Sequence, residues 1–312
     1  MTEPLKILCL FDYLLQDGKF KFDKFLGIIS ESNFFGETSL CYVRDLESFD
    51  FSKIHEFDIL FLFGMASKLD GMSCKLKEYP RANAEITKFM AAGKGLFGTG
   101  DHGSLGFRLC GNVPRLRFMR EWENNPNSKS VERLTTTRPT GLIESEGDQR
   151  DNIPQRIYPY IFENNRPHYL LQTNYDAELG KNYINFFPDH AHEGECLVPA
   201  AKSPIYQHET EFPPGAKIEA VAKSMSAGAA NSDGGPAVIP REFISISVYD
   251  GFKSGVGRIV CDATWHHFLD MNLEGIADSN DPKLQQVYER IKRYYVNIVT
   301  VSYTHLTLPT KA

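Results

Sequence analysis

The stretch FDILFLFGM, Phe57–Met65, contains a short continuous run of apolar residues. Such a run is typical of a parallel strand that is covered on both faces, because an exposed face would produce an alternating pattern. A helical pattern over Arg81–Gly93 follows, and the next apolar run, KGLFGTGDHG, begins at Lys94 and ends in a glycine-rich turn. Short apolar strands that alternate with helices predict an α/β domain with a mostly parallel sheet.

Further segments on both sides extend this pattern. LKILCLFDY, Leu5–Tyr13, has the length of a strand, and GRIVCD supplies another buried strand over Arg258–Asp262. REFISISVYD, which begins at Arg241, alternates between polar and apolar residues, as a half-exposed strand would. Asp281 and Pro282 suit the N-cap and first turn of a final helix, whose apolar stripe continues to Tyr295. We therefore expect a flavodoxin-like, mostly parallel sheet flanked by helices.

The middle of the chain lacks this regularity. From about 124 to 240 it is rich in Pro, Asn, Thr and charged residues, with few strand-like segments. We expect one α/β domain over 1–300 that carries this stretch as a large irregular insertion. Residues 301–312, VSYTHLTLPTKA, resemble a translated sequencing adapter in metagenomic proteins, and we expect them to be a non-native tail; the alternative is a genuine polar tail.

Composition excludes some classes of function. The formal net charge is -6 and no basic tract stands out, so we expect no nucleic-acid partner. No run of 18 apolar residues exists and the first residues lack a signal-peptide pattern, so we expect no membrane partner. The six cysteines are scattered without a CxxC motif, which favours free thiols and a cytoplasmic location. The expected partner is a small-molecule substrate, and the oligomeric state stays open.

Five of the nine histidines fall in three clusters that also contain carboxylates. The clusters are GTGDHG with Asp101 and His102, DHAHEGE with Asp189, His190, His192, Glu193 and Glu195, and DATWHHFLD with Asp262, His266, His267 and Asp270. The first and third clusters each follow a predicted buried strand directly. Since ligands gather beyond the carboxyl ends of parallel strands, we expect these two clusters to lie on one edge of the sheet.

The spacing within DHAHEGE suits a metal ion. If the segment is extended, His190 and His192 point to the same face, and Gly194 allows a turn that brings Glu195 to them. Two imidazoles and a carboxylate suit a divalent metal such as Zn, Fe or Mn, and we expect no other cofactor. The alternatives are a polar scaffold and a solvated loop.

The other clusters supply candidate catalytic groups, and each has a structural alternative. Asp101 and His102 are candidates for a general base or a further ligand, but Asp101 could instead cap the helix that follows it. Adjacent histidines point apart on most backbones, so at most one of His266 and His267 is expected to reach a substrate, with Asp262 orienting one of them. Glu193 is a further acid–base candidate.

PRLRFMREW, Pro114–Trp122, places Arg115, Arg117 and Arg120 close together. Three arginines could bind a carboxylate, a phosphate or a sugar acid. The alternative is a solvated face in which the arginines pair with neighbouring glutamates.

Two glycine-rich motifs carry a resemblance to a known family. AAGKGLFGTGDHG and KSGVGRIVCDATWHH resemble the two strands that end near histidines in the class I glutamine amidotransferase-like superfamily, in particular its ThuA-like (trehalose-utilisation) branch. The likeness covers about 1–110 and 240–275. It implies a flavodoxin-like fold and an enzyme that acts on a sugar or another small polar molecule.

The chain departs from the glutaminases of that superfamily at the nucleophile. Gly100 stands where their catalytic cysteine would be, and Cys110 lies ten residues further on. We therefore expect a hydrolase- or lyase-type enzyme, with metal assistance, rather than a glutaminase. The alternatives are a non-catalytic module that binds a ligand or partner on the same fold, and a glutaminase that uses Cys110 or Cys196.

Overall fold

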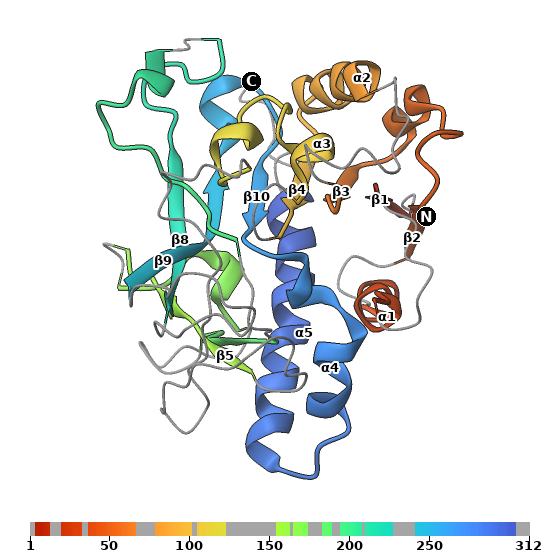
Figure 1. Cartoon of the computed structure of the whole chain (residues 1–312), viewed down its shortest axis with the longest axis vertical. Helices are drawn as coiled ribbons and strands as arrows, with labels where there is room; N and C mark the ends of the chain where they lie inside the picture. The colour runs from red at the N-terminus through yellow and green to blue at the C-terminus, as the bar shows by residue number, and fades with distance from the viewer. Residues whose placement is uncertain are drawn as a thin grey trace, which may run out of the picture.

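A computed structural model defines the architecture (Figure 1). It describes residues 4–12, 20–32, 37–66, 79–101, 105–122, 154–162, 165–173, 183–188, 194–207, 210–226 and 241–303. His102 and four members of the DHAHEGE cluster, Asp189, His190, His192 and Glu193, lie outside these ranges.

The centre of the molecule is an eight-stranded sheet with the order β2-β1-β3-β4-β10-β9-β8-β6. The five strands that are mutually parallel are β1 (Leu5–Phe11), β2 (Thr38–Val43), β3 (Ile59–Phe63), β4 (Gly95–Thr99) and β10 (Ile259–Asp262). The three antiparallel strands are β9 (Arg241–Tyr249), β8 (Ile218–Ser226) and β6 (Tyr158–Pro159). With β10 as the fifth parallel strand, the order is that of flavodoxin-like folds, so the predicted fold class is confirmed.

Helices cover both faces of this sheet. The α-helices are α1 (Asp23–Glu31), α2 (Tyr79–Ala91), α3 (Phe107–Cys110), α4 (Asp270–Ala277) and α5 (Pro282–Tyr303). The 3-10 turns are η2 (Phe51–Glu56), η3 (Leu116–Phe118), η4 (Tyr169–Leu171), η5 (Pro204–Gln207), η6 (Gly251–Ser254) and η7 (Trp265–Phe268). A separate ladder pairs β5 (Gln155–Arg156) with β7 (Phe186–Phe187). None of the described helices is both long and apolar enough to cross a bilayer.

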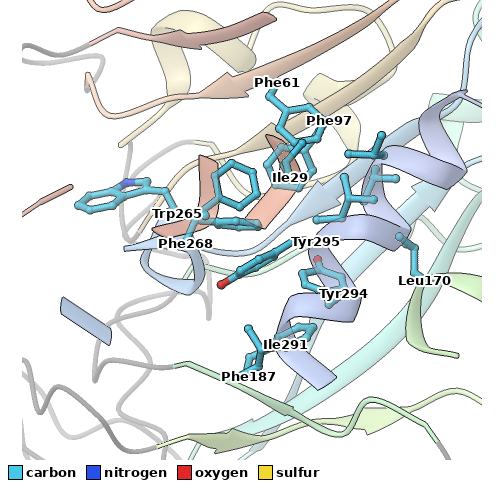
Figure 2. Packing of buried hydrophobic residues seen from close by; sticks show 14 of the residues in the cluster. Ile29, Phe61, Phe97, Leu170, Phe187, Trp265, Phe268, Ile291, Tyr294 and Tyr295 are labelled. Carbon is cyan, nitrogen blue, oxygen red and sulfur yellow. The ribbon is translucent and has the colours of Figure 1, made fainter. Parts of the chain in front are cut away.

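The continuous apolar strands contribute to two cores at once. In β3, Phe61 and Phe63 pack with α1, α4 and α5, whereas Leu60 and Leu62 pack with α2 and α3 on the other face. Successive side chains of a strand point to opposite faces, so a strand covered on both sides must be apolar throughout. Figure 2 shows the first core, in which Phe61 and Phe97 of the sheet lie near Phe268 and near Tyr295 of α5.

The structure confirms the predicted cap of the last helix, whereas the expected exposure of one strand and the alternative capping role of Asp101 are wrong. Asp281 caps α5, because its side chain accepts a hydrogen bond from the backbone N–H of Lys283 at 2.8 Å. The alternating segment at 241–249 was expected to be half-exposed, but β9 is an almost fully buried strand whose Ser247 donates to the carbonyl of Met119 at 3.0 Å. Asp101 does not cap α3, whose N-cap is Gly106. These two errors share a cause, since buried polar side chains find partners far away in the sequence.

The predicted insertion contributes to the sheet, since β6 and β8 both lie within 124–240. At the other end, α5 continues to Tyr303 and buries Val301 and Ser302. The helix therefore extends three residues into the segment expected to be a tail, and 304–312 lie outside the described residues.

Candidate active site

The carboxyl ends of four parallel strands meet at one edge of the sheet. Gly64, which follows β3, donates its N–H to the carbonyl of Thr99 in β4 at 3.0 Å. Trp265, which follows β10, donates to the carbonyl of Gly100 at 2.8 Å. Asp12 follows β1 and donates its backbone N–H to Phe63 at 3.5 Å. Polar residues just beyond these strands are thereby brought together, as expected for the functional edge of such a fold.

Asp101 and His266 form a buried pair on this edge. Oδ2 of Asp101 lies 2.8 Å from Nε2 of His266, and Oδ1 accepts a hydrogen bond from the hydroxyl of Thr264 at 3.1 Å. The side chain of Thr264 also accepts from the backbone N–H of His266 at 3.1 Å, which fixes the start of η7. The indole of Trp265 stacks on the imidazole with the centroids 3.9 Å apart. The first and third predicted clusters therefore meet in direct contact.

Arg120 connects this pair to the surrounding segments. Its guanidinium donates to the carbonyl oxygens of Asp101, Glu121 at 2.8 Å and Ala263 at 2.8 Å, and the side chain is almost completely buried. These backbone contacts rule out the solvated face for Arg120. Arg120 therefore connects the ends of β4 and β10 through the carbonyl oxygens of Asp101 and Ala263.

The described residues of the DHAHEGE segment, Gly194 and Glu195, lie beside Arg120 and Glu121. A Cβ on Gly194 would stand 1.9 Å from Nη2 of Arg120 and 2.8 Å from the carbonyl oxygen of Ala263, so only glycine fits there. The next residue, Glu195, accepts a backbone hydrogen bond from Glu121 at 2.9 Å. Burial, with a smaller contribution from the charge of Glu121, raises the pKa of the Glu195 carboxyl to about 7.

His267 lies in a different environment from its neighbour His266. Nδ1 of His267 is 2.7 Å from Oδ1 of Asp262, and Oδ2 of Asp262 accepts from the hydroxyl of Tyr294 at 2.7 Å. The hydroxyl of Tyr295 donates to the carbonyl of His267 at 2.6 Å, and the imidazole of His267 packs on Phe187 with the ring centroids 4.9 Å apart. Both members of this pair have no exposed surface. Asp262 thus orients His267 inside the core.

Asp12 belongs to the same edge and was missed from the sequence. Its Oδ1 accepts from the backbone N–H groups of Met65 at 2.5 Å and Ala66 at 3.0 Å. Burial raises the pKa of its carboxyl from 3.8 to about 7, against the opposing effects of these N–H groups and of Arg108. The only signal in the sequence was an aspartate directly after an apolar strand.

Arg115 and Arg117 converge on Glu211. The backbone N–H of Arg115 donates to Oε2 of Glu211 at 2.7 Å, and Arg117 forms an ion pair with Oε1 of the same carboxylate. Nε of Arg115 binds the carbonyl oxygen of Glu211 at 3.0 Å. The substrate-binding role predicted for these two arginines stays a prediction, and their partner is a distant glutamate rather than the neighbouring ones.

The cysteines of this region are buried thiols. Burial raises the pKa of Cys110 and of Cys196 well above the ordinary range for a thiol. A Cβ on Gly100 would lie 2.5 Å from the carbonyl oxygen of Leu105 and 2.9 Å from Trp122, so the position predicted for a glutaminase nucleophile has no room for a side chain.

Metal-ligating residues do not gather among the described residues, where no group of three or more His, Cys, Asp or Glu side chains is placed to hold an ion. Of the three predicted ligands only Glu195 belongs to the described part of the chain, so the site formed by His190, His192 and Glu195 stays a prediction.

Comparison with known proteins found no matching family model and no matching curated protein. Among solved structures the chain resembles the N-terminal domain of mmIFT52, with a TM-score of 0.48 and 10% identity over 98% of this chain and 100% of that one. It also resembles a ThuA-like protein from Bacteroides uniformis, with a TM-score of 0.45 and 10% identity over 95% and 93% of the two chains. A ThuA-like protein from Parabacteroides merdae has a TM-score of 0.40 and 11% identity over 99% and 93%. At these identities none of the matches assigns the chain to a family.

Proposed function

We propose that the chain is a ThuA-like enzyme of the hydrolase or lyase type, in which Asp101 and His266 act as an acid–base pair on a sugar or another small polar substrate. The observation that carries the proposal is the 2.8 Å contact between Asp101 and His266 at the carboxyl edge of the parallel sheet. Chemistry in open α/β folds takes place at this edge. The contact joins two strand ends that are 165 residues apart in the sequence.

The hydrogen bonds of the pair support a role in general acid–base catalysis. Asp101 accepts a hydrogen bond from the hydroxyl of Thr264, and its other carboxyl oxygen lies within hydrogen-bond distance of Nε2 of His266. A neutral imidazole that donates from Nε2 carries its lone pair on Nδ1, which is then the atom that takes up and returns a proton. Asp101 would stabilise the imidazolium formed in that step, and Arg120 would keep the two strand ends in register.

A second candidate function is a non-catalytic module that binds a ligand or partner on the same fold. The burial of the pair favours it, because the side chains of Asp101 and His266 are only 1% and 3% exposed. A substrate must reach His266 for catalysis, whereas a structural pair needs no access.

Metal assistance through His190, His192 and Glu195 belongs to the first candidate. The pKa of Glu195 is raised by burial and by Glu121, and a nearby cation would relieve both effects. Such an ion would lower the pKa of a bound water and make it a nucleophile. Elemental analysis of untagged protein tests this directly. We expect stoichiometric Zn, Fe or Mn in the wild type and its loss in His190→Ala/His192→Ala.

The test of the main proposal is a turnover screen with chromogenic esters, lactones and glycosides. We expect the turnover of wild-type protein to fall by about 10²–10⁴ in Asp101→Asn and in His266→Gln, since a positioned acid–base group contributes that much. His55→Gln is the matched control, because His55 is partly exposed and pairs with Glu85 on another part of the surface. Turnover that survives in both folded variants would remove the acid–base role and leave the binding module as the better account.

A further inference from the structure

A cavity of about 680 Å³ lies at the amino-terminal end of β10, and the Asp101–His266 pair lies beyond the carboxyl-terminal end of the same strand. Its lining includes Arg258, which precedes β10, and Asp250, which follows the antiparallel neighbour β9. The candidate active site lies beyond the other end of β10, after Asp262. We propose that this cavity is a second, separate binding site for an uncharged, polyhydroxylated small molecule.

The dimensions and lining of the cavity suit a small ligand. Its volume is within the range of about 300–1,000 Å³ that is usual for small-molecule sites. Phe162, Pro167 and Tyr169 supply apolar surface, and His168 and Gln172 supply polar groups. Such a mixture binds molecules that have both an apolar ring face and hydroxyl groups.

The segment around η4 that carries these polar groups is held in place by a side chain of α5. Asn297 of α5 is completely buried, and its Nδ2 donates to the carbonyl oxygens of Tyr169 at 3.2 Å, Leu170 at 3.0 Å and Gln172 at 2.8 Å. The turn η4 is therefore preformed. A preformed site loses little conformational entropy when a ligand binds.

His168 and Gln172 offer a ligand a defined donor and a defined acceptor. Nδ1 of His168 accepts from the backbone N–H of Leu170 at 3.2 Å, so the neutral ring has its proton on Nε2. Burial lowers the pKa of His168 to about 4, so the ring is neutral at physiological pH. Nε2 of Gln172 donates to the carbonyl of Pro167 at 2.8 Å, which leaves the amide oxygen of Gln172 as an acceptor.

The charges around the cavity compensate one another. Of the charged residues in the lining, Arg258 and Asp250 pair with each other, with Nε 3.1 Å from Oδ1. Oε1 of Glu219 lies 3.0 Å from Nζ of Lys217, which is outside the lining. A charged ligand would have to compete with these pairs, and an uncharged ligand would not. The balance favours a neutral polyol or monosaccharide over an amine or an acid.

The test measures binding of glucose and myo-inositol to the full chain by saturation-transfer NMR, with glucosamine and glucuronate as charged probes. Tyr169→Ala and Gln172→Ala are the variants, because they remove lining side chains and keep the backbone carbonyls that Asn297 binds. Tyr42→Ala is the matched control, since Tyr42 on β2 is 56% exposed and does not line this cavity.

We expect a neutral probe to bind, and its affinity to fall at least about tenfold in both lining variants but not in the control. The proposal is overturned if neither neutral probe binds, if a charged probe binds more tightly than glucose, or if Tyr169→Ala and Gln172→Ala bind as the wild type does. His266→Gln is expected to leave this binding unchanged, so the result does not depend on the proposed catalytic function.

Discussion

His266 and His267 are neighbours in the sequence, and each contacts an aspartate at almost the same distance, 2.8 Å for Asp101 and 2.7 Å for Asp262. Their surroundings differ. His266 lies at the strand ends beside Thr264 and Trp265, whereas His267 packs on Phe187 in the first core, and both side chains are almost completely buried. Two Asp–His pairs are thus formed by successive histidines. One lies at the strand ends where chemistry is expected, and the other lies inside the core.

The cause of the difference is the turn η7. The side chain of Thr264 caps it, and the two successive imidazoles leave the turn in different directions. A buried polar pair must satisfy its remaining hydrogen-bonding atoms from whatever lies nearby. For Asp262 the partner is Tyr294 from α5, and for Asp101 it is Thr264 from the same turn. The chemistry of a residue pair therefore says less about its role than the elements that enclose it.

The largest effect is expected from a variant that breaks the Asp262–His267 pair in the core. Asp262→Ala should lower the free energy of unfolding by about 3–5 kcal/mol, because it leaves His267, Tyr294 and the N–H of Thr264 without their acceptor. Urea unfolding measures the change. Asp45→Ala, at an exposed aspartate that bonds only local groups in its own turn, should change stability little. Equal effects of the two variants would contradict a structural role for the core pair.

The next effect concerns Asp12, which lies at the same strand ends as the Asp101–His266 pair. Its folded-state pKa of about 7 exceeds its ordinary 3.8, so its contribution to stability is fully present below pH 3.8 and is lost as the pH rises through 7. Asp12→Asn keeps the acceptor for Met65 and Ala66 without the buried charge. We expect it to stabilise the protein on the order of a few kcal/mol at pH 8 and much less at pH 4.

Thermal unfolding of Asp12→Asn and wild type across this pH range measures the difference. Asp50→Asn is the control, because Asp50 is an exposed cap whose pKa is lowered, not raised, by its bonds to Ser52. A stability gain that does not depend on pH would contradict the raised pKa of Asp12.

A direct comparison of the two histidines should give a smaller effect. His267→Gln is expected to cost about 1–2 kcal/mol more stability than His266→Gln, because the ring of His267 packs on Phe187 inside the core. Chemical unfolding of the two variants side by side checks the order. If His266→Gln were the more damaging, the edge pair would be the structural one and the proposed assignment would be reversed.

The smallest expected effect lies at the opposite edge. The pKa of His168 falls from 6.5 to about 4 on folding, so its contribution is present above pH 6.5 and is lost as the pH falls through 4. His168→Asn can still accept from the N–H of Leu170 and has no imidazole to protonate. We expect this variant to retain about 1–2 kcal/mol more of its neutral-pH stability than wild type at pH 5.5. Identical acid unfolding curves would show that the ring titrates in the ordinary range.

Much of the fold was predictable because strands that are buried on both faces have continuous apolar runs in the sequence. The apolar runs at 57–65 and 94–100 indicated central strands, and the glycine and polar residues after them indicated the functional edge. The buried character of β9 was not predictable, because the segments that cover it come from elsewhere in the chain. Met119 accepts a hydrogen bond from the hydroxyl of Ser247, and the backbone N–H of Cys196 donates to the carbonyl of Ile244. Asp12 escaped notice for the same reason, since its partners come from the end of β3.

The sequence alone indicates the alternation of strands and helices, the placement of Asp101 and His266 beyond two buried strands, and a glycine at position 100 in place of a nucleophile. Only the tertiary structure decided which aspartate each histidine contacts, that Arg120 binds three carbonyl oxygens, and that Asn297 shapes a cavity at the far edge. The physical reason is that periodicity records the average environment of an element. Hydrogen-bond partners more than 100 residues apart are set by which strand ends and helices the folded sheet brings together.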